Sequence, residues 1–199
     1  RRSGPGRGGR RAACRRKRVN ALWAWWVVAA VVGYGLGAIN PAAIVARAFR
    51  VDLREVGSGN PGATNVGRAL GPRWAVLVGL LDALKGFVPA VVFGVLVGQT
   101  AGEIAGIAAV VGHITSPYLK GRGGKGVATS LGAILGVQPL LAVPALLAFG
   151  IGVAVWHRVG LGAVLAALTL IVSGIVMWQQ PLVIKWLNRG RSQEQQKTT

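Results

Sequence analysis

The sequence is short of acidic residues, with only five against 23 lysines and arginines, so its formal net charge is +18. It also has a single cysteine, Cys14, which excludes a scaffold of intrachain disulfides. Hydrophobic residues make up 52% of the chain, too large a share for an intrinsically disordered protein. A chain that is both this apolar and this basic must keep its charges apart from its apolar segments.

Charged residues are in fact absent from four long stretches of the chain. These stretches are Val19–Ala46, Gly86–Gly102, Gly126–Trp156 and Val159–Ile184. A helix needs about 20 apolar residues to cross the hydrocarbon core of a membrane, so runs of this length are typical of spanning helices. The pattern predicts an all-α fold, a polytopic integral membrane helical bundle, and disfavours a soluble globular domain.

Counting apolar runs between polar segments predicts five spans. They are Leu22–Ala46, Trp74–Gly98, Gly102–Ser116, Gly126–Trp156 and Gly160–Trp178. The fourth is long for one helix, and Pro139 or Pro144 can divide it. The polar segment Arg47–Arg73, the loop Lys120–Lys125 and the C-terminal tail then share one side, which their short basic composition marks as cytoplasmic.

Nine of the basic residues lie in the first eighteen positions. This segment has no apolar periodicity, and we predict a disordered tail over residues 1–18. With five spans the tail falls on the side opposite the other basic loops, against the positive-inside rule. It either contacts anionic lipid headgroups or nucleic acid, or it is a solvated flank that affects only topology. We expect no nucleic-acid partner.

A polar segment at residues 57–68 is the first candidate site. Its glycines free the backbone to approach a ligand, and its neutral polar side chains, Ser58, Asn60, Thr64 and Asn65, can hydrogen-bond one. Arg68 supplies a forked cation suited to phosphate or carboxylate. Four glycines and four neutral polar residues in twelve positions are more than a plain turn needs, which favours a binding site.

The second candidate is Gly121–Thr129, a glycine-rich segment that leads into an apolar helix. Gly123, Gly124, Lys125 and Gly126 precede the helix, where backbone donors and the helix dipole attract anions. Gly126 occupies the position where a nucleotide-binding P-loop has the Ser or Thr that holds magnesium. We therefore predict phosphate binding, with Thr129 near the site, and neither a metal nor a cofactor.

Three ionisable residues interrupt the apolar runs. Asp82 and Lys85 are three positions apart on a predicted helix and can pair, either at a substrate site or as a structural ion pair between helices. His113 lies shortly before the Lys125 loop. It is either a base or phosphate donor, or a structural residue at a helix end.

These motifs together resemble one family, the bacterial acyl-phosphate:glycerol-3-phosphate acyltransferases (PlsY). Residues 57–68 are similar to the family's first motif, and the other matching motifs follow in the family's order over about residues 30–135. They are Tyr34–Pro41, Asp52–Arg54, Leu81–Gly86, Gly112-His113 and Gly123–Thr129.

The resemblance implies transfer of a fatty acyl group from acyl phosphate to glycerol 3-phosphate, which gives lysophosphatidate and phosphate and begins phospholipid synthesis. It implies seven membrane helices in the bacterial cell membrane and an active site open to the cytoplasm. Ser58 and Arg68 would then line the substrate site with Asn60 and Thr64 beside them, and the loop around Lys125 would hold the phosphate of glycerol 3-phosphate. On this basis the domains are a tail over residues 1–18, a membrane acyltransferase domain over 19–187 and a polar tail over 188–199.

The C-terminal part departs from the family pattern. Gln180 and Val183 stand where the family's third motif has a His and an Asn, and the serines expected around residues 160–163 are missing. The alternative function is therefore a non-catalytic membrane protein, either a carrier of phosphorylated small molecules or an inactive relative.

Overall fold

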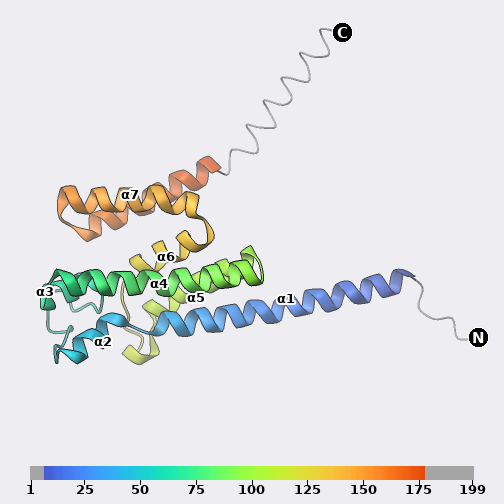
Figure 1. Ribbon diagram of the computed structural model, residues 1–199, viewed down its shortest axis with the longest axis horizontal. Helices are drawn as coiled ribbons and strands as arrows, with labels where there is room; N and C mark the ends of the chain where they lie inside the picture. The colour runs from blue at the N-terminus through green and yellow to red at the C-terminus, as the bar shows by residue number, and fades with distance from the viewer. Residues whose placement is uncertain (1–6, 178–199) are drawn as a thin grey trace, which may run out of the picture. The chain divides into compact units, whose positions relative to one another are not determined.

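The chain folds into helices throughout the part that the structure describes. The computed structural model describes the backbone of residues 7–177 and the side chains from residue 22 onward. The elements are α1 (Arg7–Ala38), α2 (Pro41–Ala48), α3 (Ala63–Leu70), α4 (Pro72–Leu96), α5 (Gln99–Ile114), the 3-10 helix η1 (Pro117–Leu119), α6 (Val127–Val137), α7 (Pro139–Trp156) and a helix over Val159–Met177. The prediction of an all-α membrane protein is confirmed (Figure 1).

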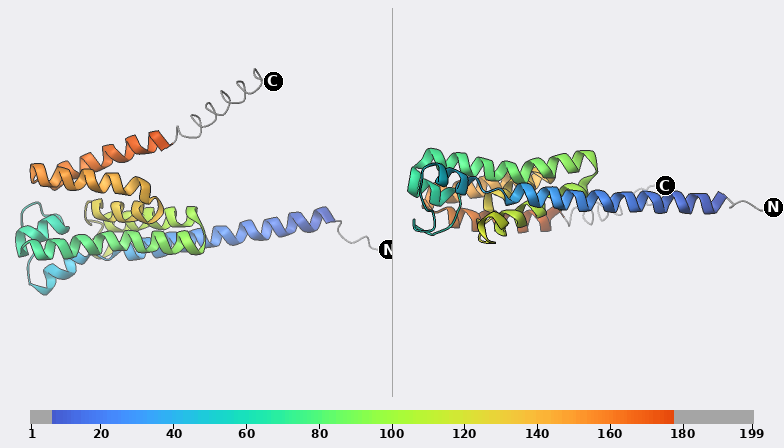
Figure 2. Two further views of the ribbon diagram at one scale, coloured as in Figure 1. Left: turned by 45° about the horizontal axis from the view of Figure 1, so that its top comes forward. Right: turned by 90° about the horizontal axis from the view of Figure 1, so that it is seen from below.

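The chain forms two compact units, of which the first ends at Pro139 and the second begins at Leu140. In the first unit, α5 packs against both α1 and α4, and α4 also packs against α6 (Figure 2). In the second unit, α7 packs against the helix Val159–Met177 where Gly152 meets Gly162. Every predicted site residue lies in the first unit.

Small residues form the contacts between the helices of the first unit. Gly37 on α1 lies against the carbonyl of Ala109 on α5, and Gly132 on α6 lies against the carbonyl of Ala83 on α4. The buried core contains more alanine than any other residue. Lipid tails are as apolar as leucine, so membrane helices associate through close backbone contact at such small residues rather than through hydrophobic burial.

Four of the described helices are long and apolar enough to cross a membrane. They are Leu22–Ala48, Pro72–Leu96, Pro139–Trp156 and Val159–Met177. The five-span count differs because the predicted third span is α5, which has 16 residues and is about 24 Å long, whereas the hydrocarbon core is about 30 Å thick. The seven spans that the resemblance implies likewise exceed these four.

Proline positions divide the helices as expected in one place and not in another. The run Gly126–Trp156 breaks before Pro139, which separates α6 from α7. Pro144 lies inside α7 without ending it, and Pro89 lies inside α4 in the same way. Proline is tolerated within a membrane helix when neighbouring groups satisfy the freed carbonyl.

The first helix takes in most of the basic N-terminal segment. Helix α1 begins at Arg7 and so includes residues 7–18 of the segment for which the sequence predicts a disordered tail. These residues contain alanine, arginine and lysine, which have high helix propensity, and no proline. The apolar helix that follows gives them a nucleus to extend, because adding a residue to an existing helix is easier than starting one.

The two basic segments of the first unit lie at the same end of it. The guanidinium Nη2 of Arg54 donates to the carbonyl oxygen of Arg122, which joins the segment 47–73 to the loop 120–125. The N-terminal end of α1 points away from α2 and α3 (Figure 1). The basic N-terminal residues and the two basic loops therefore lie toward opposite ends of this unit.

The close contact between α1 and α5 can be tested at two glycines of α1. A Cβ on Gly37 would overlap the carbonyl oxygen of Ala109, whereas a Cβ on Gly35 would meet no atom within 4 Å. We expect Gly37→Ala to destabilise the protein by about 1–3 kcal/mol, because the helices must separate. Gly35→Ala is the matched control and should melt at or slightly above the wild-type temperature. Thermal unfolding in detergent measures both, and equal melting temperatures would contradict this packing.

Candidate active site

The first glycine-rich segment is organised by one buried side chain on α3. Asn65 is 1% exposed, and its Nδ2 donates to the carbonyl oxygen of Leu53 at 2.9 Å. Its Oδ1 accepts a hydrogen bond from the backbone N–H of Ser58 at 3.2 Å. Gly57 and Gly59 have φ angles of +53° and +66°, a backbone conformation that disfavours other residues. Asn65 therefore holds the segment in a tight turn that only glycine fits well.

The turn leaves three of the predicted site residues accessible. Ser58, Thr64 and Arg68 are exposed, and Asn60 is half-buried. The side chain of Arg68 lies beside Gly57, where an added Cβ would come within 3.1 Å of its Cδ. The segment thus presents the hydroxyl of Ser58 from its loop and the guanidinium of Arg68 from α3, a pair that suits a ligand that carries phosphate.

The second glycine-rich segment lies over the C-terminal end of α5. The backbone N–H of Gly123 donates to the carbonyl oxygen of Ile114 at 2.9 Å, and that of Gly124 donates to the carbonyl oxygen of His113 at 3.1 Å. A Cβ on Gly124 would overlap Nε2 of His113. The absence of a side chain at this position is therefore what lets the loop lie on the imidazole.

Lys125 is exposed directly before α6, whose N-cap is Gly126 with a φ of +79°. No side chain caps this helix. The first backbone N–H groups of a helix have no partner within it, so the start of α6 carries partial positive charge next to the ammonium group. Such a concentration of positive charge favours an anion at this position, where the sequence predicts a phosphate site.

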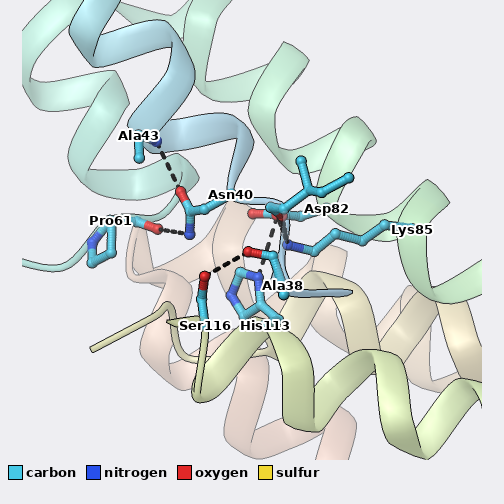
Figure 3. Close-up of polar contacts among 9 residues, drawn as sticks. Ala38, Asn40, Ala43, Pro61, Asp82, Lys85, His113 and Ser116 are labelled. Carbon is cyan, nitrogen blue, oxygen red and sulfur yellow. Dashed lines mark hydrogen bonds and ion pairs between the residues drawn. The ribbon is translucent and has the colours of Figure 1, made fainter. Parts of the chain in front are cut away.

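Three predicted site residues form a buried ionic cluster beneath this loop (Figure 3). Nζ of Lys85 lies 2.9 Å from Oδ1 of Asp82, and Nδ1 of His113 lies 3.4 Å from the same oxygen. Asp82 and His113 are each 3% exposed, and Thr129 is fully buried. Lys85, Asp82 and His113 therefore pair with one another, and of the three only Lys85 also borders an open cavity. The hydroxyl of Thr129 has no hydrogen-bond partner among the described residues.

The sequence analysis missed two residues of this region. Asn40 is 5% exposed, caps α2 by accepting from Ala43 N at 2.8 Å, and donates from Nδ2 to the carbonyl oxygen of Pro61 at 3.1 Å. Ser116 is fully buried and donates to the carbonyl oxygen of Ala38 at 2.6 Å. An Asn before a Pro is a recognisable helix start, so the capping role of Asn40 was readable from the sequence.

Two open cavities adjoin these segments. A cleft of about 480 Å³ is bordered by Arg47, Arg50 and Arg54. An apolar groove of about 410 Å³ lies between α4 and the end of α1 with α2, and Lys85 is its one charged lining residue. The other residues that line the groove are Leu36, Ile39, Pro41, Ile44, Val45, Leu81, Leu84 and Val88. A groove of this composition suits a hydrocarbon chain.

Comparison with known proteins identifies relatives over most of the chain. A family model described as glycerol-3-phosphate acyltransferase matches residues 27–189. A glycerol-3-phosphate acyltransferase of Thermoanaerobacter pseudethanolicus is 44% identical over 154 residues, which cover 76% of this chain and 77% of the relative. One from Aquifex aeolicus is 42% identical over 144 residues, covering 70% and 73%.

A solved structure is similar as well. The crystal structure of PlsY, described as an integral membrane glycerol 3-phosphate acyltransferase, superposes in its glycerol 3-phosphate form with a TM-score of 0.72 at 38% identity. The match covers 76% of this chain and 77% of that one. Its lysophosphatidic acid form gives a TM-score of 0.69 at 37% identity.

The role of Asn65 in the first segment can be tested against its neighbour Thr64. Asn65→Ala removes both hydrogen bonds of a buried amide and leaves Ser58 N and Leu53 O without these partners. We expect a loss of about 1–3 kcal/mol in stability and faster proteolysis within residues 51–62. Thr64→Ala, at an exposed position, should change neither. Limited proteolysis in detergent, read by mass spectrometry, measures the effect, and identical cleavage of the two variants would contradict the assignment.

Proposed function

The chain belongs to the glycerol-3-phosphate acyltransferase family of membrane enzymes, and on that premise we propose that it transfers a fatty acyl group from acyl phosphate to glycerol 3-phosphate. The products are lysophosphatidate and inorganic phosphate. The observation that best supports this reaction is the pair of exposed cations that belong to the two glycine-rich segments, Arg68 on α3 and Lys125 directly before α6. Both substrates carry phosphate, and one also carries a chain that is soluble in the membrane.

Acyl phosphate is a mixed anhydride and is already activated, so the enzyme requires no covalent nucleophile. It must bring the glycerol hydroxyl to the acyl carbonyl and stabilise the oxyanion and the leaving phosphate. We assign the loop around Lys125 to the phosphate of glycerol 3-phosphate and Arg68 to phosphate charge at the reacting end. Ser58, exposed on the adjoining turn, orients the attacking hydroxyl, with Asn60 and Thr64 beside it.

The proton of the attacking hydroxyl needs an acceptor. His113 is 3% exposed, and Gly124 lies against its Nε2, which supports a role beneath the loop rather than at the substrate. A phosphate oxygen of the substrate itself is then the better-placed acceptor. Asn65, Asp82 and Thr129 are buried as well, and Asn65 contributes to the site by holding the backbone of the first segment.

The acyl chain has a place in the apolar groove between α4 and the end of α1 with α2. Its α4 lining residues lie near the middle of the apolar helix Pro72–Leu96, so we expect a lipid substrate to reach the groove from the hydrocarbon core of the membrane. Lys85 at its inner surface belongs to the same buried cluster as His113, which lies under the phosphate loop. This arrangement supports a site where a hydrocarbon chain and a phosphate group are held by one unit.

No comparison favours the non-catalytic alternative. The family match continues to residue 189 and so extends across Gln180 and Val183, the two positions that depart from the family pattern. Both positions lie outside the described residues.

We further propose that the enzyme lies in the plasma membrane with its active site facing the cytoplasm. Arg54 and Arg122 lie at the end of the first unit where both glycine-rich segments are found, and clusters of basic loops mark the cytoplasmic side. Phosphorylated metabolites such as glycerol 3-phosphate are also cytoplasmic.

The orientation can be measured by cysteine labelling in a Cys14→Ser background. Lys120→Cys, in the exposed second loop, should react with a membrane-impermeant maleimide only after spheroplasts are opened. Thr100→Cys, at the α4–α5 turn, is the control for the opposite side and should react in intact spheroplasts. The reversed pattern would contradict a cytoplasmic site.

The reaction is tested with purified protein in detergent, supplied with glycerol 3-phosphate and either acyl phosphate or acyl-CoA. We expect lysophosphatidate from acyl phosphate only. Product from acyl-CoA alone would reject the proposed donor, and no product from either would reject the reaction.

The phosphate site is tested by Arg68→Ala and Lys125→Ala. Each should raise the KM for glycerol 3-phosphate at least about tenfold, because a charge-assisted hydrogen bond contributes about 1.5–3 kcal/mol. Arg73→Ala is the matched control, since Arg73 is also exposed but lies outside both segments. Wild-type kinetics in both site variants would refute the assignment.

A further inference from the structure

A chain of polar contacts, buried at both ends and open to the apolar groove at Lys85 and Ile39, connects the two glycine-rich segments (Figure 3). It begins at Pro61 in the first segment, passes through Asn40 and the break between α1 and α2, and continues through Lys85 and Asp82 to His113 under the second segment. Its members come from regions far apart in the sequence. None of its side chains needs to touch a substrate for the chain to affect the reaction.

The first half of this chain depends on a two-residue gap between helices. Ile39 and Asn40 lie between α1 and α2, so the backbone there is not helical. The carbonyl oxygen of Ile39 accepts a hydrogen bond from Nζ of Lys85 at 2.8 Å. The next residue, Asn40, donates to Pro61 O, which lies one residue after Asn60 and three after Ser58. The gap thus attaches α4 to the first segment.

The second half attaches α4 to the phosphate loop. The Asp82 carboxylate lies between Lys85 Nζ at 2.9 Å and His113 Nδ1 at 3.4 Å. The other ring nitrogen of His113 is covered by Gly124, whose N–H bonds to the His113 carbonyl oxygen. Any shift of the imidazole must therefore move the loop that carries Lys125.

Burying the polar groups of such a chain costs free energy. Polar and ionic groups lose hydration on entering a membrane protein, and apolar residues alone could join the same helices. What polar contacts add is direction, because each hydrogen bond fixes a distance and an angle. Acyl transfer needs that accuracy, since reacting atoms must approach to about 3–3.5 Å and an error of about 1 Å can cost about 100-fold in rate.

We propose that Asn40 and Lys85 are positioning residues that hold the Ser58 segment and the Lys125 loop at a fixed distance and orientation, which we call their register. The proposal rests on the proposed acyl transfer, in which one segment orients the hydroxyl while the other binds the phosphate of the same molecule. Loss of the register leaves the phosphate bound and the hydroxyl misplaced. It should therefore lower kcat far more than it raises the KM for glycerol 3-phosphate.

Asn40→Ser separates the two functions of Asn40. Serine caps a helix as well as asparagine does, so α2 keeps its N-cap, but the shorter side chain lacks the amide that donates to Pro61 O. We expect kcat to fall at least about tenfold, with the KM for glycerol 3-phosphate within about twofold of wild type. The melting temperature should fall only as far as the loss of one buried hydrogen bond requires, because Pro61 O loses its donor. If Asn40→Ser fails to fold, Asn40→Asp takes its place in the test. It keeps the shape and the cap but replaces the donor with an acceptor, and it should show the same fall in kcat.

Ser116→Ala is the matched control. Ser116 is buried and bonds to Ala38 O beside the same helix gap, but its side chain bonds to neither segment. Its loss should leave kcat and KM near wild type. An equal fall in kcat for Ser116→Ala and Asn40→Ser would show a general effect of the gap and would overturn the proposal, as would wild-type kcat in Asn40→Ser.

A distance measurement makes the test independent of catalysis. Spin labels at Thr64→Cys and Lys120→Cys, in a Cys14→Ser background, report the separation of the two segments. Asn40→Ser and Lys85→Met should each broaden that distance distribution, whereas Ser116→Ala and Lys85→Arg should keep it narrow. If the wild type makes no lysophosphatidate, the proposed function fails while this measurement still decides the register. An unchanged distribution in Asn40→Ser and Lys85→Met would overturn the register alone.

Discussion

Inside a membrane a polar group has no water to bond to, so it must find its partners within the protein. The first unit is arranged around this constraint. Where α1 ends and α2 begins, the carbonyl oxygen of Ala38 accepts a hydrogen bond from Ser116 and that of Ile39 accepts one from Lys85. Asn40 caps the helix that follows. The interruption that creates these unsatisfied groups also brings α4, α5 and the first glycine-rich segment together. A continuous helix through residues 39–40 would have offered none of these attachment points.

Glycine makes the rest of the arrangement possible. Helices α4 and α6 meet backbone to backbone, with Gly86 against the carbonyl of Thr129 and Gly132 against the carbonyl of Ala83, which holds the start of α6 against the helix that carries Asp82. The same lack of a side chain lets Gly124 lie on the His113 imidazole. The loop that carries Lys125 therefore packs against α5 through Gly124, whereas Lys125 itself is exposed. A rigid base under an accessible loop is the combination that a site for a small charged substrate needs.

The division between exposed and buried polar residues also separates their roles. Ser58, Arg68 and Lys125 are exposed, whereas Asn65, Asp82 and His113 are buried, and the amide of Asn65 holds the backbone of the first segment. In the proposed reaction the acyl donor is already activated, so the part we propose for the protein is chiefly the relative placement of the substrates.

The sequence by itself determined that this is a helical membrane protein, because apolar runs and their flanking charges reflect local solvation alone. It also determined the two phosphate-binding candidates and the family, since glycine-rich turns and ordered motifs are local features. It did not determine where α5 begins and ends or that α1 extends back to Arg7. Only the tertiary structure decided that Asp82 and His113 meet, that Asn40 reaches Pro61, and that Gly124 covers the imidazole. Those contacts join different helices and loops, and their existence depends on how closely the helices pack, which no local pattern encodes.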